Sequence, residues 1–186
     1  VPARPFTGES DQDLFFTWRA SLERRMNELF LSPMERLDVL VAHTAGKARK
    51  VVNMYHATSG FDPAAALSTV SSKLHERFGS GQKVATSLQK KVAALPKLRD
   101  DAKLGDRLQE LHQHCHALAI NQPYVPALQS LNLQVGQEPI WRKLPERYMN
   151  RWCREGAKFV RENGGQHPTF AQFLKFLEDL VAESSC

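Results

Sequence analysis

The sequence predicts an all-α protein made of two small helical lobes joined by a short glycine and serine hinge. Apolar residues recur at steps of three or four nearly throughout the 186 residues, which indicates about nine or ten helices. Several stretches begin at a capping residue, in three places with proline or glutamine placed as a capping signal requires. No stretch alternates apolar and polar residues with period two, and no Asn-Gly or Asp-Gly turn lies between β-branched runs.

The first two helices have recognisable starting signals. One apolar stripe begins at Phe15, and Ser10 before it is the candidate N-cap, with Asp13 near the positive end of the helix dipole. The next stripe begins at Ser32, which can cap the helix, while Glu35 completes a capping box and the intervening proline fills the first turn. We therefore expect helices after both signals.

Two further helices complete the first lobe. An apolar stripe follows a break near Gly46 and ends around Tyr55. Asp62, followed by a proline, repeats the capping signal and begins a stripe that reaches Phe78.

Gly79, Ser80 and Gly81 are the best candidate for a boundary between lobes, because two glycines flanking a serine relax the backbone. The charge balance changes at the same place: residues 1–80 carry 10 Lys/Arg against 9 Asp/Glu, and the rest of the chain carries 15 against 11. We predict a hinge at these three residues between lobes at 1–80 and 82–186, each with apolar residues for a small core.

The second lobe begins with an apolar stripe that Pro96 stops. The cleanest helical stripe of the chain then runs from Leu104 to Leu118. A less regular stretch follows, helical in its spacing but interrupted by Gly136 and Pro139.

Two helices are predicted at the C-terminal end of the chain. Pro145 is placed in the first turn of one, which closes at an Asn-Gly-Gly sequence beginning at Asn163. Thr169 and Gln172 form a capping box ahead of the other.

The sequence shows none of the usual signatures of an enzyme. It has no Gly-x-Ser-x-Gly elbow, no phosphate-binding loop and no Asp-Thr/Ser-Gly triplet. His112 and His116 lie one helical turn apart, but Cys115 belongs to the apolar stripe and no second ligand pair has the spacing of a zinc site. We expect no catalysis, metal or cofactor.

Composition indicates a folded protein of a reducing, intracellular compartment. Three scattered cysteines cannot form a disulfide framework. No apolar run approaches the roughly 18 residues that span a bilayer, and the first residues lack the pattern of a signal peptide. Because the chain does not begin with Met, we expect it to be part of a longer polypeptide.

A series of landmarks, in this order and spacing, resembles the Gag capsid region of Bel/Pao-type long-terminal-repeat retrotransposons over essentially the whole chain. The landmarks are Pro5-Phe6-Thr7-Gly8-Glu9, Trp18, Leu31-Ser32-Pro33-Met34-Glu35-Arg36-Leu37-Asp38-Val39-Leu40, Ala45-Gly46-Lys47-Ala48, Ala66-Leu67, Leu74-His75-Glu76-Arg77-Phe78-Gly79 and Arg142-Lys143-Leu144-Pro145-Glu146-Arg147. The sequence departs from the family at Lys47, where the family tends to have an acid, and lacks the zinc knuckle that often follows such domains.

The resemblance implies the two-lobe fold of retroviral capsid proteins and of the neuronal capsid-like protein Arc. It implies a structural protein that associates with itself, through rings of first lobes and pairs of second lobes, in cytoplasmic virus-like particles. In such proteins a zinc knuckle or a basic tail usually binds RNA, so the resemblance implies that RNA would be bound through flanking segments. Separately, the basic residues of this chain are interspersed with acids, which disfavours RNA binding by the chain itself. The alternative is a monomeric, domesticated module that holds partner peptides in a groove between helices.

The interface candidates combine that implication with position in the sequence. Phe16 and Trp141 lie off the cleanest apolar stripes. For ring contacts we predict the surface around Phe16, Arg24 and Arg25, and for contacts of the second lobe the surface near Trp141, Met149 and Trp152.

Overall fold

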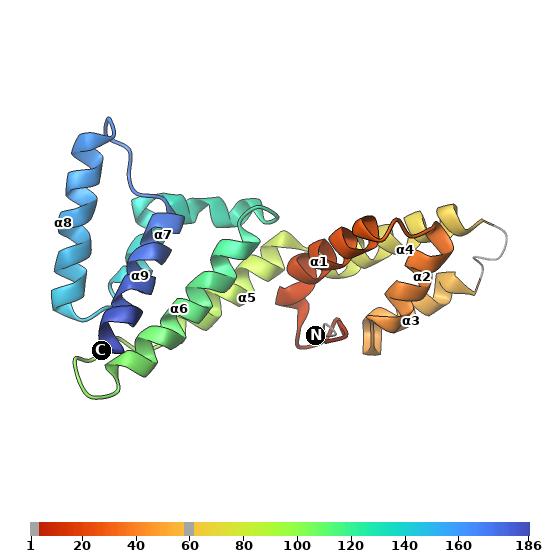
Figure 1. The fold of residues 1–186 in the computed structure, drawn as a ribbon, viewed down its shortest axis with the longest axis horizontal. Helices are drawn as coiled ribbons and strands as arrows, with labels where there is room; N and C mark the ends of the chain where they lie inside the picture. The colour runs from red at the N-terminus through yellow and green to blue at the C-terminus, as the bar shows by residue number, and fades with distance from the viewer. Residues whose placement is uncertain (1–3, 58–61) are drawn as a thin grey trace. The chain divides into compact units, whose positions relative to one another are not determined.

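The computed structural model describes residues 4–57 and 62–186. Over these residues the protein is all-α, as predicted, and the only extended pairing is an isolated parallel bridge between Phe6 and Thr44. Its helices in chain order are η1 (Gln12–Leu14), α1 (Phe15–Glu28), α2 (Pro33–Ala42), α3 (Gly46–His56), α4 (Pro63–Phe78), α5 (Gly81–Ala93), α6 (Leu104–Asn121), η2 (Pro126–Asn132), α7 (Gln134–Trp141), α8 (Glu146–Glu162) and α9 (Phe170–Ser184) (Figure 1).

The chain divides into two compact units, Val1–Val84 and Ala85–Cys186. The division lies within α5, a few residues after the predicted boundary. Between α4 and α5 the helical path is interrupted only at Gly79 and Ser80, and Ser80 accepts a hydrogen bond from the amide of Lys83 in the first turn of α5. The hinge at Gly79, Ser80 and Gly81 therefore stays a prediction.

Three of the four predicted caps are present. Ser32 and Glu35 form a reciprocal capping box at the start of α2, and Thr169 and Gln172 form another at α9. The carboxylate of Asp62 accepts a hydrogen bond from the amide of Ala65 and caps α4. These side chains satisfy amide groups that the first helical turn leaves without partners.

The fourth predicted cap, Ser10 at the start of α1, is wrong, and no side chain caps this helix. Ser10 is exposed and caps no helix, because the short helix η1 lies between Ser10 and the start of α1. Asp11 organises this turn instead: its carboxylate accepts hydrogen bonds from the Thr7 amide and hydroxyl, at 2.8 and 2.7 Å, and from the Gly8 amide at 2.9 Å. The side chain closes a loop that precedes the helix rather than the helix itself.

The segment around Phe6 is hydrogen-bonded to the turn between α2 and α3. The Phe6 amide donates to His43 O, the Ala45 amide donates to Phe6 O, and the Ala48 amide donates to Thr7 O. These bonds pair two segments that are about forty residues apart in the sequence.

Phe6 is also the centre of an aromatic cluster in the first unit. Its ring is buried and stacks on Trp18 with centroids 5.0 Å apart, and it meets Phe78 edge-on at 5.5 Å and Phe15 at 5.6 Å. Gly8 lies against the same cluster, at a positive φ of 73°, where a Cβ atom would fall 2.3 Å from the Phe78 ring. This position admits no side chain.

The core of the second unit lies between α6 and α9, which pack side by side (Figure 1). The apolar stripe of α6 is buried as predicted, Cys115 included. From α8, Trp152 packs edge-on against Phe173 and contacts Phe176, each with ring centroids 5.1 Å apart.

The segment that joins α7 to α8 ties the end of α5 to this unit. The Leu98 amide donates to Lys143 O at 2.7 Å, and Lys143 Nζ donates to the carbonyls of Ala93 and Leu95. Leu144 is fully buried. Pro145 is the cap residue just before α8 rather than a member of its first turn, a one-residue difference from the prediction.

Gly136 and Pro139 do not interrupt the chain as predicted, since α7 continues through both. Gly136 has a packing role, because a Cβ atom there would fall 2.1 Å from the carbonyl oxygen of Ser130 in η2. Pro139 lacks a backbone donor but is tolerated in an eight-residue helix, where few intrahelical bonds are lost.

Replacing Gly8 with alanine is expected to lower the free energy of unfolding by roughly 3–5 kcal/mol, since it adds steric overlap with Phe78 to the cost of a positive φ. Gly46→Ala is the matched control: its φ is also positive, at 50°, but the added Cβ meets only ordinary contacts. We expect a loss of about 1–2 kcal/mol there. Equal losses in urea denaturation of the two variants would contradict the close contact at Gly8.

Asp11→Ala is expected to lower the free energy of unfolding by about 1–2 kcal/mol at pH 7, while Ser10→Ala changes it by less than about 0.5 kcal/mol. Burial alone raises the pKa of the Asp11 carboxyl, but the bonds from Thr7 and Gly8 outweigh it and hold the pKa below its ordinary value. The carboxylate's contribution is therefore present above the unfolded-state pKa of about 3.9 and is lost as the pH falls through the lower folded-state pKa. Urea denaturation from pH 7 to 2.5 should show the difference between wild type and Asp11→Ala narrowing; a constant difference would refute this.

Candidate interaction surfaces

Two of the predicted interface residues lie in the cores of their units. Phe16 is 9% exposed, with its ring next to those of Phe15 and His75. Trp152 is 5% exposed and packs on α9. Phe16 follows Phe15 on the inner side of α1, so its position off the strict apolar stripe did not make it a surface residue.

The other four candidates keep accessible surface. Arg24 and Arg25 are exposed on α1, and Arg24 approaches Glu28 at 4.0 Å, one turn along the helix. Trp141 and Met149 are partly exposed in the second unit. Their role as interface residues stays a prediction.

Trp141 lines a groove of about 400 Å³ together with several residues of α8. Trp152, Cys153, Gly156 and Ala157 of α8 line it, so the groove brings the predicted residues Trp141 and Trp152 together. The Arg142 guanidinium lies 5.7 Å from the centroid of the Trp141 ring. This surface is mostly apolar and concave.

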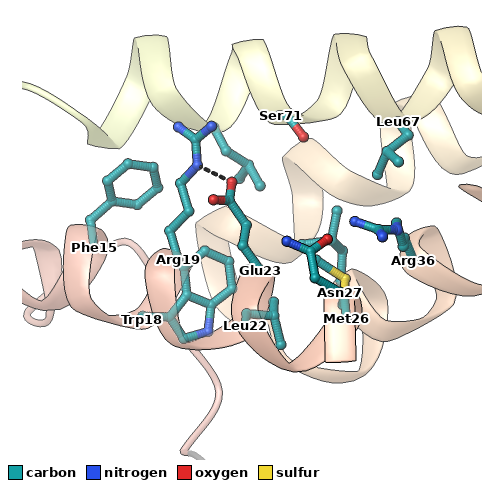
Figure 2. A pocket seen from close by; sticks show the side chains of 12 residues that line it. Phe15, Trp18, Arg19, Leu22, Glu23, Met26, Asn27, Arg36, Leu67 and Ser71 are labelled. Carbon is teal, nitrogen blue, oxygen red and sulfur yellow. Dashed lines mark hydrogen bonds and ion pairs between the residues drawn. The ribbon is translucent and has the colours of Figure 1, made fainter. Parts of the chain in front are cut away.

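A second groove, of about 160 Å³, lies in the first unit between α1 and α4, with α2 at one end. Figure 2 shows Leu67 and Ser71 of α4 facing Leu22 and Met26 of α1 across it. Charged groups border the apolar floor; Arg19 and Glu23 form an ion pair at 2.8 Å along one edge. The groove has room for about one side chain of a ligand.

The corner between α1 and α2 exposes more apolar surface than any of the predicted candidates. Phe30 is 91% exposed, and Leu29 and Met34 beside it in the sequence are 60% and 37% exposed. We call Leu29, Phe30 and Met34 the Phe30 corner. Three apolar side chains within six positions are unusual on a surface that is otherwise rich in charge.

The backbone at this corner is also strained. Phe30 has a φ of 51°, the left-handed conformation that glycine adopts at the end of a helix. The Leu31 amide donates to Met26 O and the Phe30 amide donates to Asn27 O, which is the Schellman arrangement. A phenylalanine here costs roughly 1–2 kcal/mol of backbone strain, and its ring gains no burial in return. The fold alone gives no reason for this residue.

The histidine cluster on α6 does not form a metal site with its neighbouring cysteine. The rings of His112 and His116 stack with centroids 6.2 Å apart, but Cys115 points into the core. Among the residues that the structure describes, no three His, Cys, Asp or Glu side chains gather as a metal site requires.

No described helix is long and apolar enough to cross a membrane. No protein-family model, curated protein or solved structure matches this chain.

The three thiols are expected to differ sharply in reactivity. Burial raises the pKa of Cys115 to about 12, whereas Cys153 and Cys186 are exposed. A colourimetric disulfide reagent at pH 8 should therefore label two thiols in the native protein and three after denaturation, because thiolates are the reactive species. Cys153→Ser should leave one reactive thiol in the native protein. Rapid labelling of all three without denaturant would contradict the buried position of Cys115.

Proposed function

We propose that this protein is the capsid part of a retrotransposon Gag, or of a host protein descended from one, and that it works in the cytoplasm by associating with copies of itself. Its role is structural rather than catalytic. The Phe30 corner carries the proposal of self-association, because its apolar side chains are exposed at a cost in backbone strain that a partner would offset.

The positions of the landmark residues support the resemblance to Gag capsids. Phe6, Trp18 and Phe78 come from three separate landmarks, and their rings meet in one cluster. The landmark around Gly46 is hydrogen-bonded to the one around Phe6. Lys143 joins two segments of the second unit. Because these landmark residues contact one another in the fold, a shared fold would preserve them in the same order along the chain.

A shell or ring needs only weak individual contacts, because each subunit makes several of them at once. The Phe30 corner suits such a contact: it is small, apolar and bordered by the charged residues Arg25 and Glu28. The predicted interface residues Arg24 and Arg25 are exposed on α1, the helix that ends just before Phe30, and lie within six positions of it. We propose that the first units of neighbouring copies contact one another through the Phe30 corner to form rings of subunits. We propose the Trp141 groove as the surface through which the second units pair.

Phe30→Gly is expected to weaken self-association while leaving the free energy of unfolding unchanged or raising it by up to about 1 kcal/mol, since glycine relieves the strain and removes the ring. Sedimentation velocity and electron microscopy over a range of protein and salt concentrations measure the association. Met54→Gln is the matched control, because Met54 is 67% exposed in the same unit but lies outside the corner.

Two outcomes would contradict different parts of this proposal. A wild-type protein that stays monomeric under all conditions would refute self-association. Assemblies that form equally well with Phe30→Gly would retain self-association but remove the Phe30 corner from it.

The α1–α4 groove favours a second candidate function, that of a monomeric module which binds a partner peptide. Its apolar floor and charged border suit a segment with one apolar anchor flanked by charges (Figure 2). Replacing Ser71 with tryptophan would fill the groove without touching the Phe30 corner. Under this second function the replacement abolishes peptide capture by a monomer; under the first it leaves assembly intact.

A further inference from the structure

A segment at the middle of the chain is rich in basic residues and contains no acid. Between Glu76 and Asp100 there are six Lys/Arg residues and no Asp or Glu. The overall charge balance conceals this segment, because acids elsewhere in the chain offset it. Four of the six cations, Lys90, Lys91, Lys97 and Arg99, belong to the second unit and are exposed.

The fold directs these cations to solvent. On α5, Ala85, Leu88 and Val92 are buried, so the opposite side of the helix carries Lys90 with Lys91 beside it. Residues 96–99, which follow α5, are not helical. Among them Leu98 is buried, and its amide donates a hydrogen bond to Lys143 O.

Lys97 and Arg99 flank Leu98, so their exposed side chains project away from the core that Leu98 enters. The helix and the loop thus present four cations within ten positions. We call these four residues the α5 cationic surface.

Nearby negative charge is neutralised. The C-terminal end of a helix carries a partial negative charge, and at α5 the Lys143 ammonium lies on the terminal carbonyls of Ala93 and Leu95. The next two acids are paired, Asp100 with Arg147 at 2.9 Å and Asp101 with Arg107 at 3.2 Å. Within the described ranges, Lys90, Lys97 and Arg99 have no acidic partner and remain available to an anion.

We propose that the α5 cationic surface binds the phosphate backbone of single-stranded RNA. Attraction to a polyanion requires several cations that are not already paired, and Lys90, Lys97 and Arg99 meet this condition within ten positions. Ser87, one helical turn before Lys90, adds a hydroxyl donor. No Phe, Tyr or Trp lies between Phe78 and Tyr124, so the segment has no ring on which a base can stack. The binding is therefore electrostatic and independent of sequence.

The same observations disfavour an anionic membrane as the ligand. A helix that lies on a bilayer inserts its apolar face, and the apolar face of α5 is buried in the protein. None of the large apolar residues that the described chain exposes falls between Met54 and Ile120. The surface offers charge and hydrogen-bond donors without an anchor for acyl chains.

Fluorescence anisotropy with a labelled 20-nucleotide single-stranded RNA of mixed sequence, between 50 and 300 mM salt, tests the proposal. If Lys90, Lys97 and Arg99 each contact one phosphate, the slope of log K against log salt is about −2. The double variant Lys90→Gln/Lys97→Gln should weaken binding at 50 mM salt by roughly tenfold or more and reduce the slope by about 1.4.

Lys158→Gln/Lys175→Gln is the matched control, because it removes the same charge from the same unit but from lysines paired with Glu162 and Asp179. The control should bind RNA like the wild type, and thermal melts should show that both variants fold. Equal loss in the control would mean that net charge alone attracts RNA, which would overturn the proposal, as would a failure of the wild type to bind at 50 mM salt.

Two further arms separate this surface from other ligands and from assembly. Vesicles with anionic phosphatidylserine and a polyglutamate peptide are tested at the same salt; tighter binding of either than of RNA would overturn the assignment to nucleic acid. Repeating the RNA titration with Phe30→Gly distinguishes the surface from self-association: RNA binding that persists in a protein unable to assemble supports the α5 surface by itself. Loss of RNA binding in that variant would show that the binding belongs to the assembly, and would contradict the proposal.

Discussion

The packing of Phe6 against the helices of the first unit is the contact on which the arrangement of that unit depends. On one side the backbone around Phe6 is hydrogen-bonded to the turn between α2 and α3, and on the other its ring packs on Trp18 and Phe78, from α1 and α4. One short segment therefore contacts α1, α4 and the turn between α2 and α3. Gly8 permits it, since any side chain at that position would occupy the space of the Phe78 ring. A contact of this kind constrains the sequence at several distant positions at once.

The sequence predicted the helices well because their signals are local. Caps at Ser32 and Thr169 need only a hydroxyl and a partner three residues away, and both capping boxes are present in the folded protein. The prediction for Ser10 was wrong because it considered only local chemistry. Ser10 is a suitable capping residue, but Asp11 beside it accepts the hydrogen bonds of the preceding loop, and the short helix η1 moves the start of α1 to Phe15. Gly136 was interpreted as a break because a close approach to Ser130 in η2 cannot be inferred from neighbouring residues alone.

Surface properties were harder to predict, because they depend on which side of each helix the fold covers. Phe16 lies next to a perfect apolar stripe and is nevertheless buried, while Phe30 ends a helix where glycine is usual and is almost fully exposed. One signal in the sequence did point to Phe30: no glycine or asparagine stands between the end of α1 at Glu28 and the capping box that begins at Ser32. The acid-free run around α5 was likewise readable as a local count of charges, and averaging over half the chain concealed it.

Residues that stabilise this fold and residues that are available for binding form nearly separate sets. The landmarks of the resemblance contribute mostly buried or hydrogen-bonded groups, such as Phe6, Gly8 and Leu144, so they carry information about architecture. Phe30 and the α5 lysines are exposed and contribute little to either core, so we expect their replacement to leave the packing intact. Self-association and RNA binding can therefore change in strength while the fold persists. Because the Phe30 corner belongs to the first unit and the α5 cationic surface to the second, a change in one surface leaves the residues of the other in place.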